Sequence, residues 1–188
     1  MKWIVAALSN VLVISALAGC SQPTSSGPDS KEKQTEQSIT ASAKILNADG
    51  TEVGTAVLTE GEKGVEIQVT AKDLEPGKHG FHIHETGTCQ PPDFKSAGGH
   101  FNPEGKEHGK ENPQGSHVGD LPNLEIRSDG TGKLTATAEG ATLGKGKNSL
   151  LKNGGTSLVI HAEPDDMKTD PAGDAGDRIA CGEVKEQP

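Results

Sequence analysis

Six of the seven histidines of this 188-residue chain fall between residues 82 and 161, together with an aspartate that is spaced among them. The set consists of His82, His84, His100, His108, His117, Asp120 and His161. Imidazole nitrogens and carboxylate oxygens are ligands for zinc, and imidazole also suits copper. So many ligands in so short a span indicate a centre that holds two metal ions.

The first two histidines lie in a predicted strand, Gly80–His84. Residues i and i+2 of a strand point to the same face, so His82 and His84 can approach one ion. A surface His-x-His pair is the ordinary alternative, but the segment that follows favours the metal site. Residues 98–120 hold four more of the ligands and are too rich in Gly, Pro and Asn for a helix or strand. A long irregular segment inside a domain is usually functional or disordered, and a solvated histidine-rich loop is the alternative here.

The rest of the domain predicts an all-β fold. Short segments alternate apolar and polar residues, as in a sheet with one buried face and one wet face, and Gly-containing turns separate them. The predicted strands are 41–46, 54–58, 65–69, 124–127, 133–137 and 157–161. No segment favours a long helix. Past residue 20 there is no Trp or Tyr, so the core must be largely aliphatic.

The N-terminus predicts export. Lys2 precedes an apolar run from Trp3 to Leu17, which is too short for a comfortable membrane span. The run ends in Leu-Ala-Gly-Cys20, which resembles a bacterial lipobox. We therefore expect a lipoprotein signal peptide at 1–19, with a lipid on Cys20 that anchors the chain to a bacterial membrane outside the cytoplasm. A soluble export signal is the alternative. Residues 20–37 follow as lipidated cysteine and flexible tether, because they lack large apolar side chains, and 38–186 form the domain.

Six separated motifs of the domain occur in the order found in one family. They are Gly80–His84, Gly99–Pro103, His108–Gly109, His117–Leu121, Val159–Ala162 and Gly176–Gly182. Over roughly residues 38 to 184 the chain resembles the copper/zinc superoxide dismutases. The resemblance implies an eight-stranded Greek-key β-barrel or sandwich with long metal-binding and electrostatic loops.

The resemblance also implies the ligands of each metal. Copper would be bound by His82, His84, His100 and His161. Zinc would be bound by His100, His108, His117 and Asp120, so that His100 is shared. The implied reaction converts superoxide to dioxygen and hydrogen peroxide as copper cycles between two oxidation states, while the zinc is structural and has no redox role. His100 then takes up a proton on its copper side.

Other roles follow from the same resemblance. Arg178 would hold the superoxide anion with its planar fork of donors, and so counts with His100 as catalytic. Asp165 would be the carboxylate that binds no metal itself and hydrogen-bonds ligands of both metals, although Asp166 is one residue away. His79 is expected to be structural. Cys89 and Cys181 would form a disulfide, as two cysteines of an exported protein usually do.

The formal net charge of −9 opposes an anionic substrate, so attraction must be local to Arg178 and the metals. Lys168 is given no role in steering. We expect no nucleic-acid partner. The sequence does not decide between a monomer and a homodimer, because members of the family differ in whether they dimerise. A non-enzymatic copper/zinc-binding lipoprotein on the same fold is the alternative function, but it would have no need of Arg178. A β-sandwich adhesion module would leave seven spaced ligands without a purpose.

Overall fold

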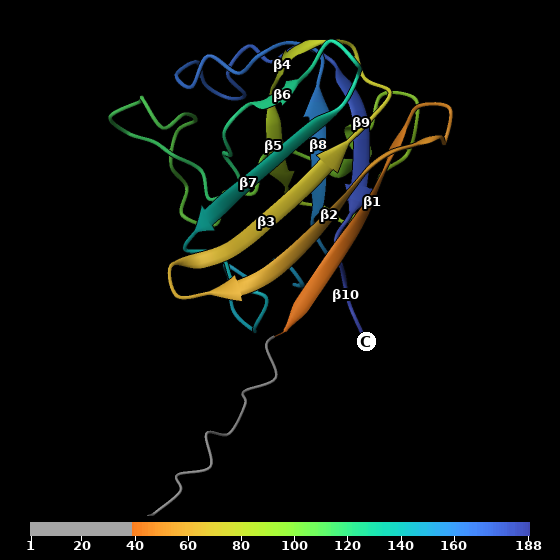
Figure 1. The fold of residues 1–188 in the computed structure, drawn as a ribbon. Coiled ribbons are helices and arrows are strands. Elements are labelled where there is room, and N and C mark those ends of the chain that lie inside the picture. Colours follow the sequence, from red (N-terminus) through yellow and green to blue (C-terminus); the bar gives the residue numbers. More distant parts are fainter. Residues whose placement is uncertain (1–38) are drawn as a thin grey trace, which may run out of the picture. The chain divides into compact units, whose positions relative to one another are not determined.

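The computed structural model describes residues 39–188, so the predicted signal peptide, Cys20 and tether lie outside the described residues. One antiparallel sheet dominates this part of the chain (Figure 1). Its strands are β1 (Thr40–Asn47), β2 (Glu52–Gly61), β3 (Gly64–Ala71), β4 (Gly77–His79), β5 (Phe81–His84), β6 (Leu124–Ile126), β7 (Gly132–Glu139), β8 (Ser157–His161), β9 (Arg178–Glu183) and β10 (Lys185–Glu186). A single 3-10 turn, η1 (Lys95–Ala97), is the only helical element among residues 39–188, and no helix there is long and apolar enough to cross a membrane.

The sheet nearly closes on itself. Its strand order is β4-β6-β7-β3-β2-β1-β9-β8-β5, with β10 paired to β1. The two outermost strands, β4 and β5, are consecutive in the chain and are separated only by Gly80. They therefore join the two edges into a barrel. In the same way, β10 continues β9 after Val184. If β4 with β5 and β9 with β10 are each counted as one interrupted strand, the barrel has the expected eight strands. The all-β prediction is confirmed.

The side of the barrel formed by β3 shows the predicted alternation. Val65, Ile67 and Val69 point into the core, while Glu66 and its exposed neighbours face solvent. The same core contains Phe81 of β5 and Phe101, and is otherwise aliphatic. Because successive residues of a strand point to opposite faces, the polar positions between these buried residues remain wet.

Strands β5 and β8 depart from this pattern, since every residue in both is buried. Phe81 and Ile83 fill the core, so the intervening His82 and His84 must lie on the outer face of the barrel. The expectation of a wet outer face is wrong for these two strands. Long connecting segments cover these two strands, so that their outer face is buried as well as their inner face.

Backbone hydrogen bonds hold the ligand-bearing segment against β5. The Ile83 amide donates to the Gly119 carbonyl at 2.9 Å, and the Ile83 carbonyl accepts from the Phe101 amide at 2.8 Å. A Cβ at Gly119 would lie 2.3 Å from the Ile83 carbonyl oxygen, so only glycine permits this approach. The segment 98–120 is therefore positioned by the sheet although it is not itself a strand.

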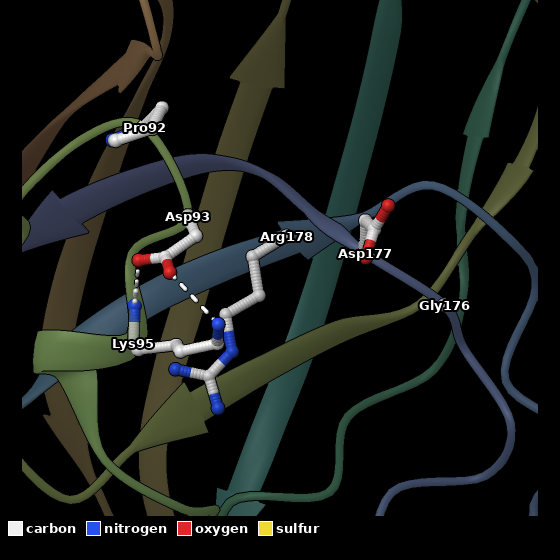
Figure 2. Close-up of a pocket in the computed structure, with 6 residues that line it drawn as sticks. All are labelled: Pro92, Asp93, Lys95, Gly176, Asp177 and Arg178. Atoms are coloured by element: carbon white, nitrogen blue, oxygen red, sulfur yellow. Dashed lines mark hydrogen bonds and ion pairs between the residues drawn. The ribbon is translucent and has the colours of Figure 1, made fainter.

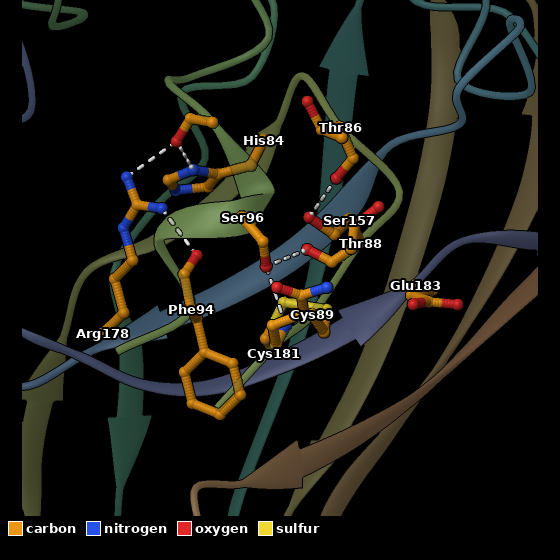
Figure 3. The surroundings of a disulfide bond; sticks show 12 residues. His84, Thr86, Thr88, Cys89, Phe94, Ser96, Ser157, Arg178, Cys181 and Glu183 are labelled. Carbon is orange, nitrogen blue, oxygen red and sulfur yellow. Dashed lines mark hydrogen bonds between the residues drawn. A yellow bond between two sulfur atoms is a disulfide. The ribbon is translucent and has the colours of Figure 1, made fainter. Parts of the chain in front are cut away.

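A disulfide joins Cys89 to Cys181, with a Cα–Cα distance of 5.6 Å, and confirms the predicted pair. It ties the loop after β5 to β9 (Figure 3) and packs in a small cluster with Phe94 and Val159. Linking residues 92 positions apart restricts the unfolded chain, which stabilises the fold by about 4 to 5 kcal/mol in the loop-closure model. The loop that approaches the histidines is thus covalently fixed.

Candidate metal centre

The structure brings the predicted ligands together in two buried sets that share His100. The first set is His82, His84, His100 and His161, and the second is His100, His108, His117 and Asp120. Within each set, one ligand atom from every residue lies within 4.8 Å of the others. Strands β5 and β8 supply three of the ligands, and the covering segment 98–120 supplies the remaining four.

The second set is organised around one carboxylate oxygen. The Nδ1 atoms of His100, His108 and His117 lie 2.9, 3.0 and 3.1 Å from Oδ1 of Asp120. Asp120 Oδ2 accepts hydrogen bonds from the Gly109 and His117 amides, which fix the carboxylate. Three nitrogens and one oxygen converging in this way match a four-coordinate zinc ion, which would replace the protons that lie between them.

Hydrogen bonding dominates the electrostatics of this second set. Burial raises the pKa of Asp120, but the three imidazoles more than offset that effect, so the pKa falls well below its usual range. Burial likewise lowers the pKa of His108, yet hydrogen bonds to Asp120 and Asp165 raise it overall to about 9. The set therefore favours positive charge at its centre, as a cation site must.

In the first set, one nitrogen of each ring bonds a carbonyl or carboxylate oxygen, and the other nitrogen is free of any oxygen partner. His82 Nε2 lies 2.7 Å from Asp165 Oδ2, and His84 Nδ1 donates to the Gly98 carbonyl at 3.0 Å. His161 Nδ1 lies 3.3 Å from the Gly176 carbonyl, and its Nε2 is 3.4 Å from His84 Nε2. The free nitrogens are therefore Nδ1 of His82 and Nε2 of the other three rings.

Two of these free nitrogens are orphaned. His82 Nδ1 and His100 Nε2 are buried with no hydrogen-bond partner among the described residues. Buried polar atoms are nearly always paired, so two orphans that belong to one set of four imidazoles point to a bound ion. Burial also lowers the pKa of His84 well below normal, that of His100 to about 4 and that of His161 to about 3. These rings are neutral at pH 7 and can donate lone pairs. The residues fit a metal.

Asp165 connects the two sets. Its Oδ2 bonds His82 of the first set, and its Oδ1 lies 3.0 Å from His108 Nε2 in the second. Asn123 holds Asp165 in place through two hydrogen bonds to its backbone. Asp166 instead bonds Lys168 and Thr169 within its own segment. Asn123 was not anticipated, since nothing in the sequence marks a residue whose role depends on a tertiary contact.

Arg178, the first residue of β9, lies beside the first set. Its guanidinium donates to the carbonyls of Phe94 and Gly98 at 2.8 and 2.7 Å, and the same Gly98 carbonyl accepts from His84 (Figure 3). Arg178 also lines a cavity of about 390 Å³ together with Lys95, whose ammonium lies 2.9 Å from Asp93 (Figure 2). The arginine is thus held rigidly between this cavity and the histidines.

Two further residues lie outside both sets. His79 on β4 bonds the backbone carbonyls of His161 and Glu75 at 2.8 and 2.9 Å, which matches the expected structural role. Lys168 pairs with Glu111 at 2.8 Å and does not line the cavity beside Arg178. The presence of Lys95 in the wall of the cavity beside Arg178 could not be predicted from the sequence. The disulfide positions η1 and the loop before it, and this is a tertiary contact.

Comparison with known proteins identifies the family. A family model described as copper/zinc superoxide dismutase matches residues 52–184. The chain is 52% identical over 151 residues to superoxide dismutase [Cu-Zn] 2 of Aquifex aeolicus, which covers 79% of this chain and 88% of that protein. It is 40% identical over 181 residues to the superoxide dismutase-like protein YojM of Bacillus subtilis, with 92% and 91% covered.

The solved structure of a SOD-like protein from Bacillus subtilis superimposes with a TM-score of 0.73 and 43% sequence identity. The match covers 76% of this chain and 96% of that one. Sequence and fold therefore both point to the family that the motifs indicate. The chain belongs to the copper/zinc superoxide dismutase family, a family of oxidoreductases whose metals are copper and zinc.

Proposed function

We propose that this protein is a superoxide dismutase of the extracytoplasmic space, with copper in the first set of ligands and zinc in the second. Two superoxide anions and two protons would yield one dioxygen and one hydrogen peroxide. The observation that supports this best is the pair of orphaned nitrogens, His82 Nδ1 and His100 Nε2, in a four-imidazole set adjoining Arg178.

The ligand types distinguish the two metals. Four neutral imidazoles suit copper, which when bound supplies the one-electron redox chemistry that dismutation needs. Three imidazoles and a carboxylate suit zinc, which has no redox chemistry of its own. His100 belongs to both sets, because its Nδ1 faces Asp120 and its Nε2 is left for the first set. Asp165 orients one ligand of each set through its two oxygens.

Arg178 would receive the anionic substrate. A guanidinium has five N–H donors, and two carbonyls fix its position while leaving donors for superoxide in the adjacent cavity. His100 would hold the proton at Nε2, the buried atom without a partner, and pass it to the reduced oxygen.

A non-enzymatic copper/zinc-binding protein on the same fold is the competing function. Holding a metal requires the two sets and Asp165, but not a cation at the cavity. The guanidinium of Arg178 is fixed by hydrogen bonds at that position, and this arrangement favours the enzyme over the binding protein.

We further propose that the protein is a bacterial lipoprotein, in which Cys20 bears a lipid and residues 21–37 tether the domain outside the cytoplasm. The lipobox-like sequence before Cys20 supports the anchor. The disulfide between Cys89 and Cys181 supports an oxidising compartment, since cytoplasmic thiols are normally kept reduced.

For Arg178→Ala, we expect dismutation by the copper- and zinc-loaded protein to slow by about ten- to a hundredfold, because a charge-assisted hydrogen bond to the substrate is lost. Inhibition by small anions should weaken in parallel, while copper content stays unchanged. Arg127→Ala removes the chain's other arginine, which is exposed, and should have no effect. An Arg178→Ala protein as fast as the wild type would contradict this role.

For Asp165→Ala, we expect the affinity for both metals to fall by about 10- to 100-fold, because one imidazole in each set loses its orienting partner. Competition titrations with chelators of known affinity measure both constants. Asp166→Ala is the matched control and should bind both metals as the wild type does, since Asp166 contacts neither set. Equal effects of the two substitutions would rule out a specific role for Asp165.

For Cys20→Ser, expressed in a bacterium that processes lipoproteins, we expect the protein to move from the membrane fraction to the soluble extracytoplasmic fraction. Immunoblots of both fractions and mass spectrometry of the N-terminus measure this. Wild-type protein that is soluble, or a Cys20→Ser protein that remains in the membrane, would refute the lipid anchor.

A further inference from the structure

We propose that zinc exchanges with solvent through its own opening, on the His117 side of the second set, and not through the cavity beside Arg178. The inference rests on the proposed assignment of zinc to that set. It concerns a cavity of about 340 Å³ whose wall includes Glu104, Ser116, His117, Asp120, Glu139 and Asn148. We call this cavity the zinc opening.

The zinc opening reaches the ligands directly. His117 and Asp120 both belong to its wall, and of these two only the side chain of His117 is accessible to a solute in the cavity. His117 is also the most accessible member of the set. Its side chain is 7% exposed, compared with 3% for His100 and 0% for His108 and Asp120. The edge of the set that faces solvent is therefore His117.

The other sides of the set are closed by described residues. The His108 ring contacts Asp165, and its backbone amide donates to Asp170 Oδ1 at 2.7 Å. Gly173 lies so close that a Cβ there would be 2.7 Å from His108 Nε2. On the remaining side, the His100 ring packs against His82 with the ring centroids 4.0 Å apart. An ion leaving in either direction would have to displace packed residues.

The two cavities are independent. The zinc opening is lined from residues 104–120, the end of β7 and residue 148, whereas the cavity beside Arg178 is lined by residues 92–95 and 176–178. No residue belongs to both walls. The zinc opening can therefore be narrowed by substitution without changing the cavity beside Arg178.

The wall of the zinc opening suits the transit of a hydrated cation. Glu104 and Glu139 contribute carboxylates, and the carboxylate of Glu104 lies 2.9 Å from the Lys147 ammonium. Such oxygens accept hydrogen bonds from the water shell of an ion. Lys106 and Lys110 on the same wall balance the carboxylates, so the cavity does not itself trap a dication.

Glu139 offers the sharpest test, since it is an exposed residue at the end of β7 and belongs to neither set. Zinc content is measured first on the full chain loaded with copper and zinc. Zinc loss to an excess of a chromogenic zinc chelator is then followed for the wild type, Glu139→Trp and Glu139→Ala. Glu66→Trp is the matched control, because Glu66 is an exposed strand residue outside the cavity. Lys95→Trp narrows the cavity beside Arg178.

We expect Glu139→Trp to slow zinc release several-fold and Glu139→Ala to leave it equal or faster, with Glu66→Trp unchanged. Lys95→Trp should slow copper removal and leave zinc release unchanged. Zinc release from Glu139→Trp at the wild-type rate would overturn the proposal, and so would slower zinc release from Lys95→Trp. A chain that takes up copper but no zinc would refute the assignment of zinc itself, which is a distinguishable result.

Discussion

The burial of polar imidazoles on the outer face of β5 and β8 is the constraint on which the rest of the structure depends. An outward-facing strand residue is normally hydrated, but His82, His84 and His161 are covered. Each buried ring nitrogen therefore needs a partner. Asp165, Gly98 and the backbone near Gly176 satisfy one nitrogen of each ring, and the nitrogens left over face one another. A metal ion is what completes this arrangement.

The covering segments follow from the same requirement. Segment 98–120 brings the second set of ligands and is hydrogen-bonded to β5 at Ile83. The segment after β8 brings Asp165, which reaches both sets. The disulfide fixes the loop whose carbonyls hold Arg178. Irregular backbone that would otherwise be mobile is in this way anchored at several points, so that ligands, arginine and cavity keep fixed relative positions.

Much of this was predictable because the responsible signals are local. Alternation predicted β3 and β7 closely, and because residues i and i+2 share a face of a strand, it also predicted that His82 and His84 lie on the same face. The division of the ligands into two sets was implied only by the resemblance to the family. The short strands β4 and β10 were not predicted, since each has only two or three residues and depends on its neighbours. The contacts of Asn123, the carbonyl of Gly98 shared by His84 and Arg178, and the pairing of Lys168 with Glu111 were also out of reach. They join residues that only the tertiary fold brings together.

We propose that the protein holds a redox metal and a structural metal in two adjoining buried sets of ligands that share His100. The most direct test of this proposal measures bound copper, bound zinc and the decay of pulse-generated superoxide for the wild type, His161→Ala and His117→Ala, each supplied with both metals. We expect His161→Ala to keep zinc, lose tightly bound copper and be inactive, whereas His117→Ala should lose zinc and retain copper-dependent activity. Full activity in His161→Ala, or activity in wild type loaded with zinc alone, would contradict it.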